Sequence, residues 1–198
     1  MVEQLGMICS WSLKMSDLVK LGKYLSLILR HKPEVIDIKL DEHGWADVDE
    51  LLAGMNRQGR FINRELLDEI VKTNNKKRYQ YNDDLTKIRA NQGHSINVDV
   101  NLQEKIPPNT LYHGTALRYL DEIKLFGIKK MNRLYVHLSK DKETAINVGK
   151  RHGKAIILEI DTKKMLNDGH KFYYSNNGVW LCDDIDFKYV RRIFDDKK

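Results

Sequence analysis

The chain has 198 residues, a length that fits one large domain or two small ones. Of these residues 41% are hydrophobic and 31% charged, which is typical of a globular protein and excludes wholesale disorder. No apolar run approaches the roughly 20 residues that span a bilayer, and the N-terminus lacks the basic and apolar regions of a signal peptide, so we expect a cytoplasmic protein with no membrane partner. The net charge of +6 favours a nucleic-acid partner, with a solvated basic surface as the alternative.

The N-terminal part is expected to be mainly helical after a patternless extension over residues 1–14. Apolar residues at three- and four-residue spacing predict three helices, over residues 17–31, 48–55 and 66–71. Ser16 or Asp17 is expected to cap the first helix and Asn63 the third. Pro33 disfavours helix at the residue before it, so the first helix should end near His31.

A β-hairpin is predicted next, with strands over residues 78–81 and 85–89 around an Asn82-Asp83-Asp84 turn. Three helices followed by a hairpin suggest a winged-helix domain over residues 15–98. Such a domain often binds nucleic acid, but it also serves as a plain scaffold.

The segment 97–109, which contains Pro107 and Pro108, is the best candidate for a linker. The domain expected over residues 105–198 is α+β, with mostly short strands. Its first predicted strand starts at Thr110, and further strands are predicted over 134–138, 155–160, 172–174, 179–181 and 189–193. Its predicted helices cover 117–126 and 141–151.

Two cysteines, Cys9 and Cys182, lie far apart and match no metal-ligand spacing. In a reducing compartment they are expected to be free thiols, with a disulfide as the alternative. The sequence also lacks a Walker loop, a GxGxxG fingerprint, an HExxH and a Cys-x-x-Cys pair. We therefore expect no metal.

Candidate site residues occur in short motifs that place a cation or an imidazole beside a turn or a strand end. Guanidinium groups grip phosphate oxygens as an always-charged fork, so the motifs suggest a phosphate site. The motifs are Leu29-Arg30-His31, Lys77-Arg78-Tyr79, Gln92-Gly93-His94-Ser95, Tyr112-His113-Gly114-Thr115 and the segment from Arg133 through His137 to Ser139.

Each motif also has a structural interpretation. His31 could act as an acid or base, or donate a hydrogen bond to phosphate, beside Arg30. The alternative is that both residues only stabilise the helix, because cations in its last turn interact favourably with the helix dipole. Arg78 could be part of a solvated turn, and residues 92–95 and 112–115 could be ordinary turns. Arg133, His137 and Ser139 share one face of the predicted strand, where buried hydrogen bonds are the alternative use.

Taken in order, and with Gly44-Trp45 and Ile88-Arg-Ala-Asn-Gln-Gly-His-Ser95 between them, the motifs resemble the RNA 2′-phosphotransferase family, also called tRNA 2′-phosphotransferases. The resemblance runs from about Leu18 to Ile193. It implies an N-terminal winged-helix lobe, a C-terminal ADP-ribosyltransferase-like lobe and an active site between them. It also implies tRNA processing as a setting, with RNA carrying a 2′-phosphate and NAD⁺ as partners of a monomer.

The resemblance implies a metal-free reaction in two steps. The RNA 2′-phosphate attacks the nicotinamide-bearing ribose carbon of NAD⁺, so that nicotinamide leaves and RNA-2′-phospho-ADP-ribose forms. The ribose 2″-hydroxyl then attacks the phosphate, which releases 2′-OH RNA and ADP-ribose 1″,2″-cyclic phosphate.

The resemblance also assigns residues by motif. The catalytic set is Arg30, His31, Arg78 and Arg133. The set that binds NAD⁺ is His113, Gly114, Thr115, His137 and Ser139. Contacts to RNA or phosphate are expected from Arg89, Gln92, His94 and Ser95. One departure from the family pattern is Leu134-Tyr135, where more polar residues are typical. Val179 lies where many ADP-ribosyltransferases have a glutamate, and the resemblance implies that this glutamate is absent in the family.

Two other hypotheses remain at this point. The first is an ADP-ribosyltransferase that stops after step one and modifies terminal phosphates of RNA or DNA. The second is a winged-helix nucleic-acid binder without catalysis, which leaves the motifs after residue 110 unexplained.

Overall fold

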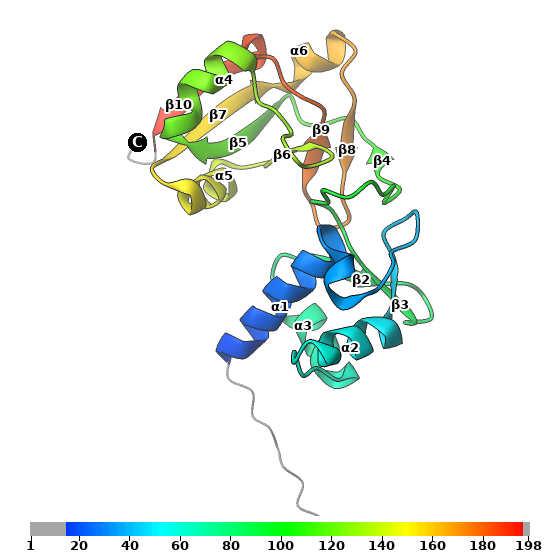
Figure 1. Cartoon of the computed structure of the whole chain (residues 1–198). Helices are drawn as coiled ribbons and strands as arrows, with labels where there is room; N and C mark the ends of the chain where they lie inside the picture. Colours follow the sequence, from blue (N-terminus) through cyan, green and yellow to red (C-terminus); the bar gives the residue numbers. More distant parts are fainter. Residues whose placement is uncertain (1–14, 196–198) are drawn as a thin grey trace, which may run out of the picture.

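The computed structural model describes residues 15–195, which form a mixed helix-and-sheet protein (Figure 1). Two separate clusters of buried hydrophobic residues mark an N-terminal half, whose cluster runs from Leu21 to Ala90, and a C-terminal half, whose cluster runs from Leu111 to Tyr189. The predicted extension 1–14 and Cys9 lie outside the described residues. Cys182 is a buried free thiol, as expected.

The N-terminal half packs three helices against a small antiparallel sheet. The helices are α1 (Met15–Arg30), α2 (Val48–Arg57) and α3 (Arg64–Thr73), and the strands β1 (Ala46–Asp47), β2 (Tyr79–Tyr81) and β3 (Lys87–Ala90) are ordered β1-β3-β2. The predicted Asn63 cap is confirmed, since its side chain accepts from Leu66 N at 3.0 Å. The prediction for the first helix cap was wrong: α1 already includes Met15, so Ser16 and Asp17 lie inside its first turn.

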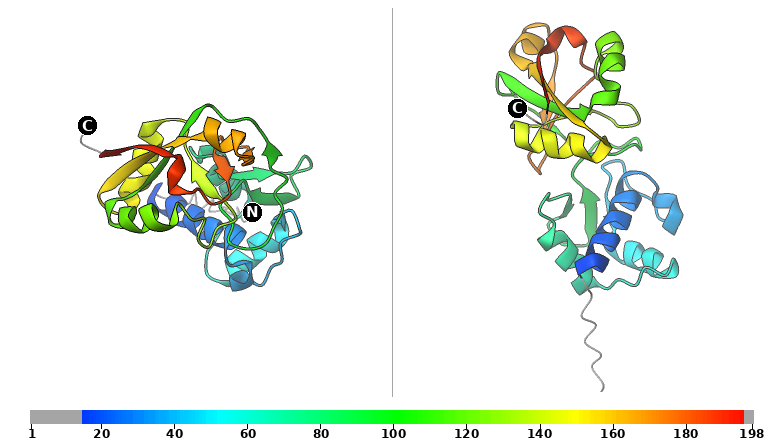
Figure 2. Two further views of the ribbon diagram at one scale, coloured as in Figure 1. Left: turned by 90° about the horizontal axis from the view of Figure 1, so that it is seen from above. Right: turned by 90° about the vertical axis from the view of Figure 1, so that its left-hand side faces the viewer.

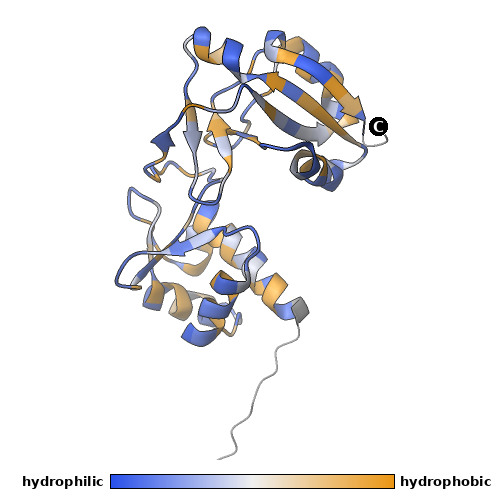
Figure 3. Cartoon of the chain, turned by 180° about the vertical axis from the view of Figure 1, so that it is seen from behind, coloured by the Kyte–Doolittle hydropathy of each residue, from blue (hydrophilic) through white to orange (hydrophobic). Residues whose placement is uncertain are grey.

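The C-terminal half holds two antiparallel sheets. The first, ordered β10-β7-β5, is formed by β5 (Thr110–Ala116), β7 (Ala155–Asp161) and β10 (Val190–Asp195). The second, ordered β4-β8-β9-β6, is formed by β4 (Gln103–Glu104), β6 (Val136–Leu138), β8 (Phe172–Tyr174) and β9 (Trp180–Cys182). A bridge between Tyr112 and Ser139 joins the sheets. The central strand β7 is mainly hydrophobic (Figure 3), because both of its faces are covered.

Short helices surround these sheets. They are α4 (Leu120–Phe126), after a 3₁₀ turn at Leu117–Tyr119, α5 (Lys142–Gly149), followed by the 3₁₀ turn η3 (Lys150–His152), and α6 (Thr162–Asn167). Asp141 caps α5 by accepting from Thr144 N at 2.7 Å. In Figure 1 and in the right-hand view of Figure 2, α5 lies on the side of the C-terminal half that faces the N-terminal half.

Several elements differ from the sequence-based expectation. Neither β1 nor α6 was predicted, because each is too short to show a period. The predicted strand 134–138 is shortened to Val136–Leu138, so Arg133 precedes it in a bend. No helix among residues 15–195 combines the length and the apolar character that crossing a bilayer needs.

Candidate active site

Three arginines converge where the two halves meet. Arg30 ends α1, Arg78 directly precedes β2, and Arg133 lies in the bend before β6. Burial first, and then the charges of Arg78 and Arg133, lower the pKa of Arg30 to about 10. No carboxylate among residues 15–195 pairs with any of the three. The site is therefore a concentration of uncompensated positive charge.

The Arg30 guanidinium is held without partners. Its Nε and Nη2 atoms are shielded from solvent, and no group of residues 15–195 accepts from them. Gly93 lies against this guanidinium with φ at +89°, and a Cβ there would come within 3.4 Å of Nη1. A glycine thus lets the backbone of 92–95 close over Arg30. Buried donors without acceptors are costly, so the arrangement suits an anionic ligand.

His31 is held beside Arg30 by Ser95. Its Nδ1 lies 2.9 Å from Ser95 Oγ, and Ser95 N donates to the carbonyl oxygen of Arg30 at 3.0 Å. Burial, with help from Arg30 and Arg133, lowers the pKa of His31. The imidazole is therefore mainly neutral at neutral pH and able to accept a proton.

A hydrogen-bonded chain links Arg133 to the other half of the molecule through His137. Arg133 Nη1 lies 3.4 Å from His137 Nδ1, and His137 Nε2 lies 2.7 Å from Gln92 Oε1. Burial first, and then the charge of Arg133, lowers the pKa of His137 to about 3. A neutral imidazole that donates to Gln92 and accepts from Arg133 fits both contacts. Leu134 N also donates across the junction to His94 O at 3.2 Å.

The predicted NAD⁺-binding residues lie on adjacent strands. His113 Nδ1 lies 3.1 Å from the carbonyl oxygen of His137, so Nδ1 carries the proton and Nε2 is an acceptor. Ser139 exchanges two backbone hydrogen bonds with Tyr112, at 2.8 and 2.9 Å. Gly114 faces α5 instead, since a Cβ there would lie 1.7 Å from Ala145 O. Thr115 is buried. His113, His137 and Ser139 are thus brought together, whereas Gly114 serves close packing.

Two of the predicted RNA or phosphate contacts are buried. Arg89 is 8% exposed, stacks 4.4 Å over the Trp45 ring and donates to His43 O at 3.2 Å. Its charged neighbours are Asp41 and Asp99, not the three arginines. His94 is 2% exposed, and burial lowers its pKa to about 4. The structure therefore separates Arg89 from the arginine cluster, while Gln92 and Ser95 lie within it.

Three asparagines that are not among the predicted site residues hold the Arg78 segment in place. Asn74 Oδ1 accepts from Arg78 Nη1 at 3.3 Å, Asn91 Nδ2 donates to Lys77 O at 2.7 Å, and Asn177 Nδ2 donates to Lys76 O at 3.0 Å. The last bond comes from the β8–β9 turn of the other half. Spacing along the chain carries no signal for such a contact, because residues 76 and 177 are far apart in sequence.

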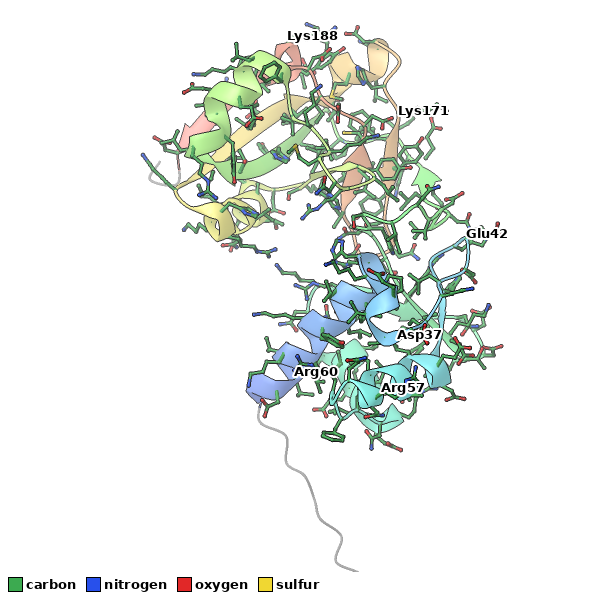
Figure 4. The ribbon with its side chains drawn as sticks, viewed as in Figure 1. Asp37, Glu42, Arg57, Arg60, Lys171 and Lys188 are labelled. Carbon is green, nitrogen blue, oxygen red and sulfur yellow. The ribbon has the colours of Figure 1, made fainter. Side chains whose placement is uncertain are left out.

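Surfaces away from the junction look different. A hollow of mixed charge is lined by Asp37, Asp49 and Arg57, of which Asp37 and Arg57 are labelled in Figure 4. Arg57 Nη2 already donates to Ile36 O at 3.1 Å. Within residues 15–195, no three His, Cys, Asp or Glu side chains gather as a metal site. The arginine cluster at the junction is therefore the candidate active site.

Arginines from both halves lie beside imidazoles and have no carboxylate partner among residues 15–195. This arrangement is typical of proteins that bind phosphate esters. Residues 16–184 match the family model described as "RNA 2′-phosphotransferase, Tpt1 / KptA family". The chain belongs to this family, whose description indicates a transferase that removes a 2′-phosphate from RNA.

Similar proteins of several bacteria have the name "Probable RNA 2′-phosphotransferase". The protein of Fusobacterium nucleatum is 57% identical over 178 residues, which cover 89% of this chain and 99% of the relative. The protein of Flavobacterium johnsoniae is 53% identical over 170 residues, 86% of this chain and 93% of the relative. A protein of Escherichia coli K12 is 46% identical over 175 residues, 88% of this chain and 95% of the relative.

Proposed function

We propose that this protein removes an internal RNA 2′-phosphate with NAD⁺ as the acceptor, without metal, between a winged-helix lobe and an ADP-ribosyltransferase-like lobe. We further propose a cytoplasmic role in the processing of tRNA or a similar RNA. The observation that carries the proposal is the Arg30 guanidinium, whose buried donors have no acceptor among residues 15–195. A dianionic phosphate is the ligand that such a group fits best.

The three arginines are suited to two tasks in turn. Arg30, Arg78 and Arg133 would first orient the RNA 2′-phosphate so that one oxygen points at the carbon under attack. In the second step negative charge grows on the phosphorus-bound oxygens, and fixed guanidinium groups stabilise it without reorganising. Arg133 also lies against His137, on the side where NAD⁺ is proposed to bind.

His31 would serve proton transfer in the second step. Its lowered pKa leaves it neutral and able to accept the proton of an attacking hydroxyl. Ser95 Oγ, 2.9 Å from Nδ1, fixes the ring so that Nε2 remains for the substrate. The imidazolium formed in this way would return the proton to the departing RNA oxygen.

Residues on β5 and β6 fit a ribose. NAD⁺ would supply a ribose carbon that accepts the phosphate and a nicotinamide that leaves. His113 Nε2 is an acceptor, because Nδ1 donates to His137 O, and an acceptor suits a ribose hydroxyl. The predicted NAD⁺-binding set of His113, Gly114, Thr115, His137 and Ser139 stays a proposal on this basis.

The test is incubation of the protein with NAD⁺ and a short RNA that carries one internal 2′-phosphate, with and without EDTA. We expect 2′-OH RNA, nicotinamide and ADP-ribose 1″,2″-cyclic phosphate at equal rates in both samples. Loss of activity in EDTA that metal restores would contradict the metal-free reaction. Accumulation of ADP-ribosylated ends on RNA or DNA, without the cyclic phosphate, would favour terminal-phosphate ADP-ribosylation, and no nicotinamide release would favour a binding protein.

A further inference from the structure

Lys76 and Arg151 are two cations at the junction that the proposed reaction does not use. Lys76 lies two residues before Arg78, and its carbonyl oxygen accepts the inter-half hydrogen bond from Asn177 at 3.0 Å. Arg151 lies in η3, directly after α5, and α5 is on the side of the C-terminal half that faces the N-terminal half (Figure 1). Both residues are exposed, in contrast to the shielded guanidinium of Arg30.

The two cations are close enough to the arginine cluster to influence its members. Partial desolvation first, and then the charges of Arg151 and Arg78, lower the pKa of Lys76. Arg151 also contributes, after burial, to the lowered pKa of Arg133. Arg151 therefore lies within electrostatic reach of both Lys76 and Arg133, although they belong to different halves. Neither Lys76 nor Arg151 pairs with a carboxylate in the described part of the chain.

The chemistry of the proposed substrate supplies a second anion at this place. A nucleotide with an internal 2′-phosphate also carries a 3′-phosphodiester on the neighbouring ribose carbon. If Arg30, Arg78 and Arg133 hold the 2′-phosphate, the phosphodiester must lie beside that cluster. Cations next to it, without protein partners, can neutralise this charge and orient the chain.

We propose that Lys76 and Arg151 form a second phosphate subsite, which binds the 3′-phosphodiester next to the 2′-phosphate of an internal nucleotide. This inference rests on the proposed function. It makes the two residues positioning residues that favour an internal 2′-phosphate over a 2′-phosphate on a 3′-terminal nucleotide, where the phosphodiester is missing.

The experiment compares two RNAs of equal sequence. One carries its 2′-phosphate internally, and the other carries it on the terminal nucleotide with a free 3′-hydroxyl. The variants are Lys76→Gln, Arg151→Gln and the double variant. Lys77→Gln and Lys154→Gln remove the same charge from neighbouring exposed positions and serve as matched controls.

We expect the double variant to raise KM for the internal substrate about 10-fold, which corresponds to about 1.4 kcal/mol, and to change KM for the terminal substrate less than about 2-fold. KM for NAD⁺ should stay unchanged. The salt dependence of RNA binding, measured by fluorescence anisotropy without NAD⁺, should lose about 0.7 of its logarithmic slope per cation removed. The control variants should affect both RNAs equally and weakly.

Three results would overturn the subsite. The first is an equal rise in KM for both RNAs. The second is a rise in KM in the control variants as large as that in the test variants. The third is a rise in KM for NAD⁺ alone, which would assign the cations to the dinucleotide pyrophosphate. The binding assay separates this inference from the proposed function. Wild-type protein that binds the internal RNA through Lys76 and Arg151, yet releases no nicotinamide, would support the subsite and reject the NAD⁺-dependent reaction.

Discussion

At the scale of single residues, the site keeps a charged group in an unfavourable environment. Arg30 has two shielded donors without acceptors and two arginines nearby. Desolvation and repulsion both oppose this arrangement. Sites that bind anions commonly accept such a cost in the free protein, because the ligand removes it on binding.

The first prediction follows for Arg30→Met. We expect turnover to fall by at least about 100-fold, while the free energy of unfolding rises by about 1 kcal/mol because an unsatisfied buried charge is removed. Urea unfolding and the NAD⁺-dependent assay measure the two quantities. Inorganic phosphate should stabilise the wild-type protein more than the variant.

Arg64→Met is the matched control, since Arg64 Nε pairs with Asp68 at 3.1 Å on the surface. Its loss should cost less than about 1 kcal/mol and leave turnover unchanged. A clear destabilisation by Arg30→Met would mean that Arg30 holds the fold together instead of waiting for a ligand.

The second prediction concerns Arg133→Ala. The side chain contacts His137 Nδ1 at 3.4 Å and no carboxylate within residues 15–195. The variant should therefore still fold. Its second step should slow by about 100-fold, because Arg133 no longer stabilises the negative charge that grows on the phosphate oxygens. Analysis of quenched reactions should show RNA-2′-phospho-ADP-ribose accumulating. Wild-type turnover would remove Arg133 from the catalytic set, and Arg192→Ala, an exposed change on β10, is the control.

At the scale of elements, the packing of α5 on β5 decides where the proposed NAD⁺-binding residues lie. A side chain at Gly114 would overlap Ala145 O, and one at Gly149 would lie 2.6 Å from Thr115 O. The backbones of helix and strand are therefore in direct contact. This packing also fixes the start of η3, which carries Arg151.

The third prediction is that Gly114→Ala destabilises the protein by roughly 3 kcal/mol or more, because α5 must move away from β5. Gly22→Ala in α1 is the control, since the nearest atom to its Cβ is Ile70 Cγ2 at 3.7 Å. That change should stabilise the protein by about 0.5–1 kcal/mol through a better helix residue. Thermal unfolding of both variants measures the difference, and equal stabilities would contradict the close packing.

At the scale of the whole molecule, neutral histidines and amides connect the two halves. His137 bonds to Gln92, Leu134 N to His94 O, and Asn177 to Lys76 O. Burial lowers the pKa of His94 to about 4 and that of His137 to about 3. Protonation of these histidines therefore opposes the native structure.

The fourth prediction is a loss of stability in mild acid. A histidine of the unfolded chain takes up its proton near pH 6.5, whereas folded His94 does so only near pH 4. Between these values the unfolded state binds more protons, so stability is complete above about pH 6.5 and falls as the pH decreases. His94 alone should lower the free energy of unfolding by about 2 kcal/mol between pH 7 and pH 5.

Urea unfolding at pH 7 and pH 5 tests this. His94→Gln should show a smaller difference between the two pH values than the wild type, and His152→Gln, at an exposed position, should not. An unchanged pH dependence in His94→Gln would show that other groups cause the loss.

The sequence by itself determined the local elements and the chemistry of the site. Helical and alternating periods predicted α1, α2, α3, β5, β7 and the β2–β3 hairpin, because backbone hydrogen bonding imposes these periods on buried faces. The order of the motifs indicated the family, and the family model confirmed it. The boundaries of the two domains and the roles of the site residues stay predictions.

Only the tertiary structure decided which charged groups meet. Arg89 looked like a phosphate ligand in sequence, yet it stacks on Trp45, whereas Lys76 and Arg151, 75 positions apart, lie near each other at the junction. Strand periodicity also overstated the length of β6, so Arg133 reaches His137 from a bend and not from a strand. The physical reason is that spacing along a chain governs contacts only within one element, whereas the packing of separate cores places distant residues together.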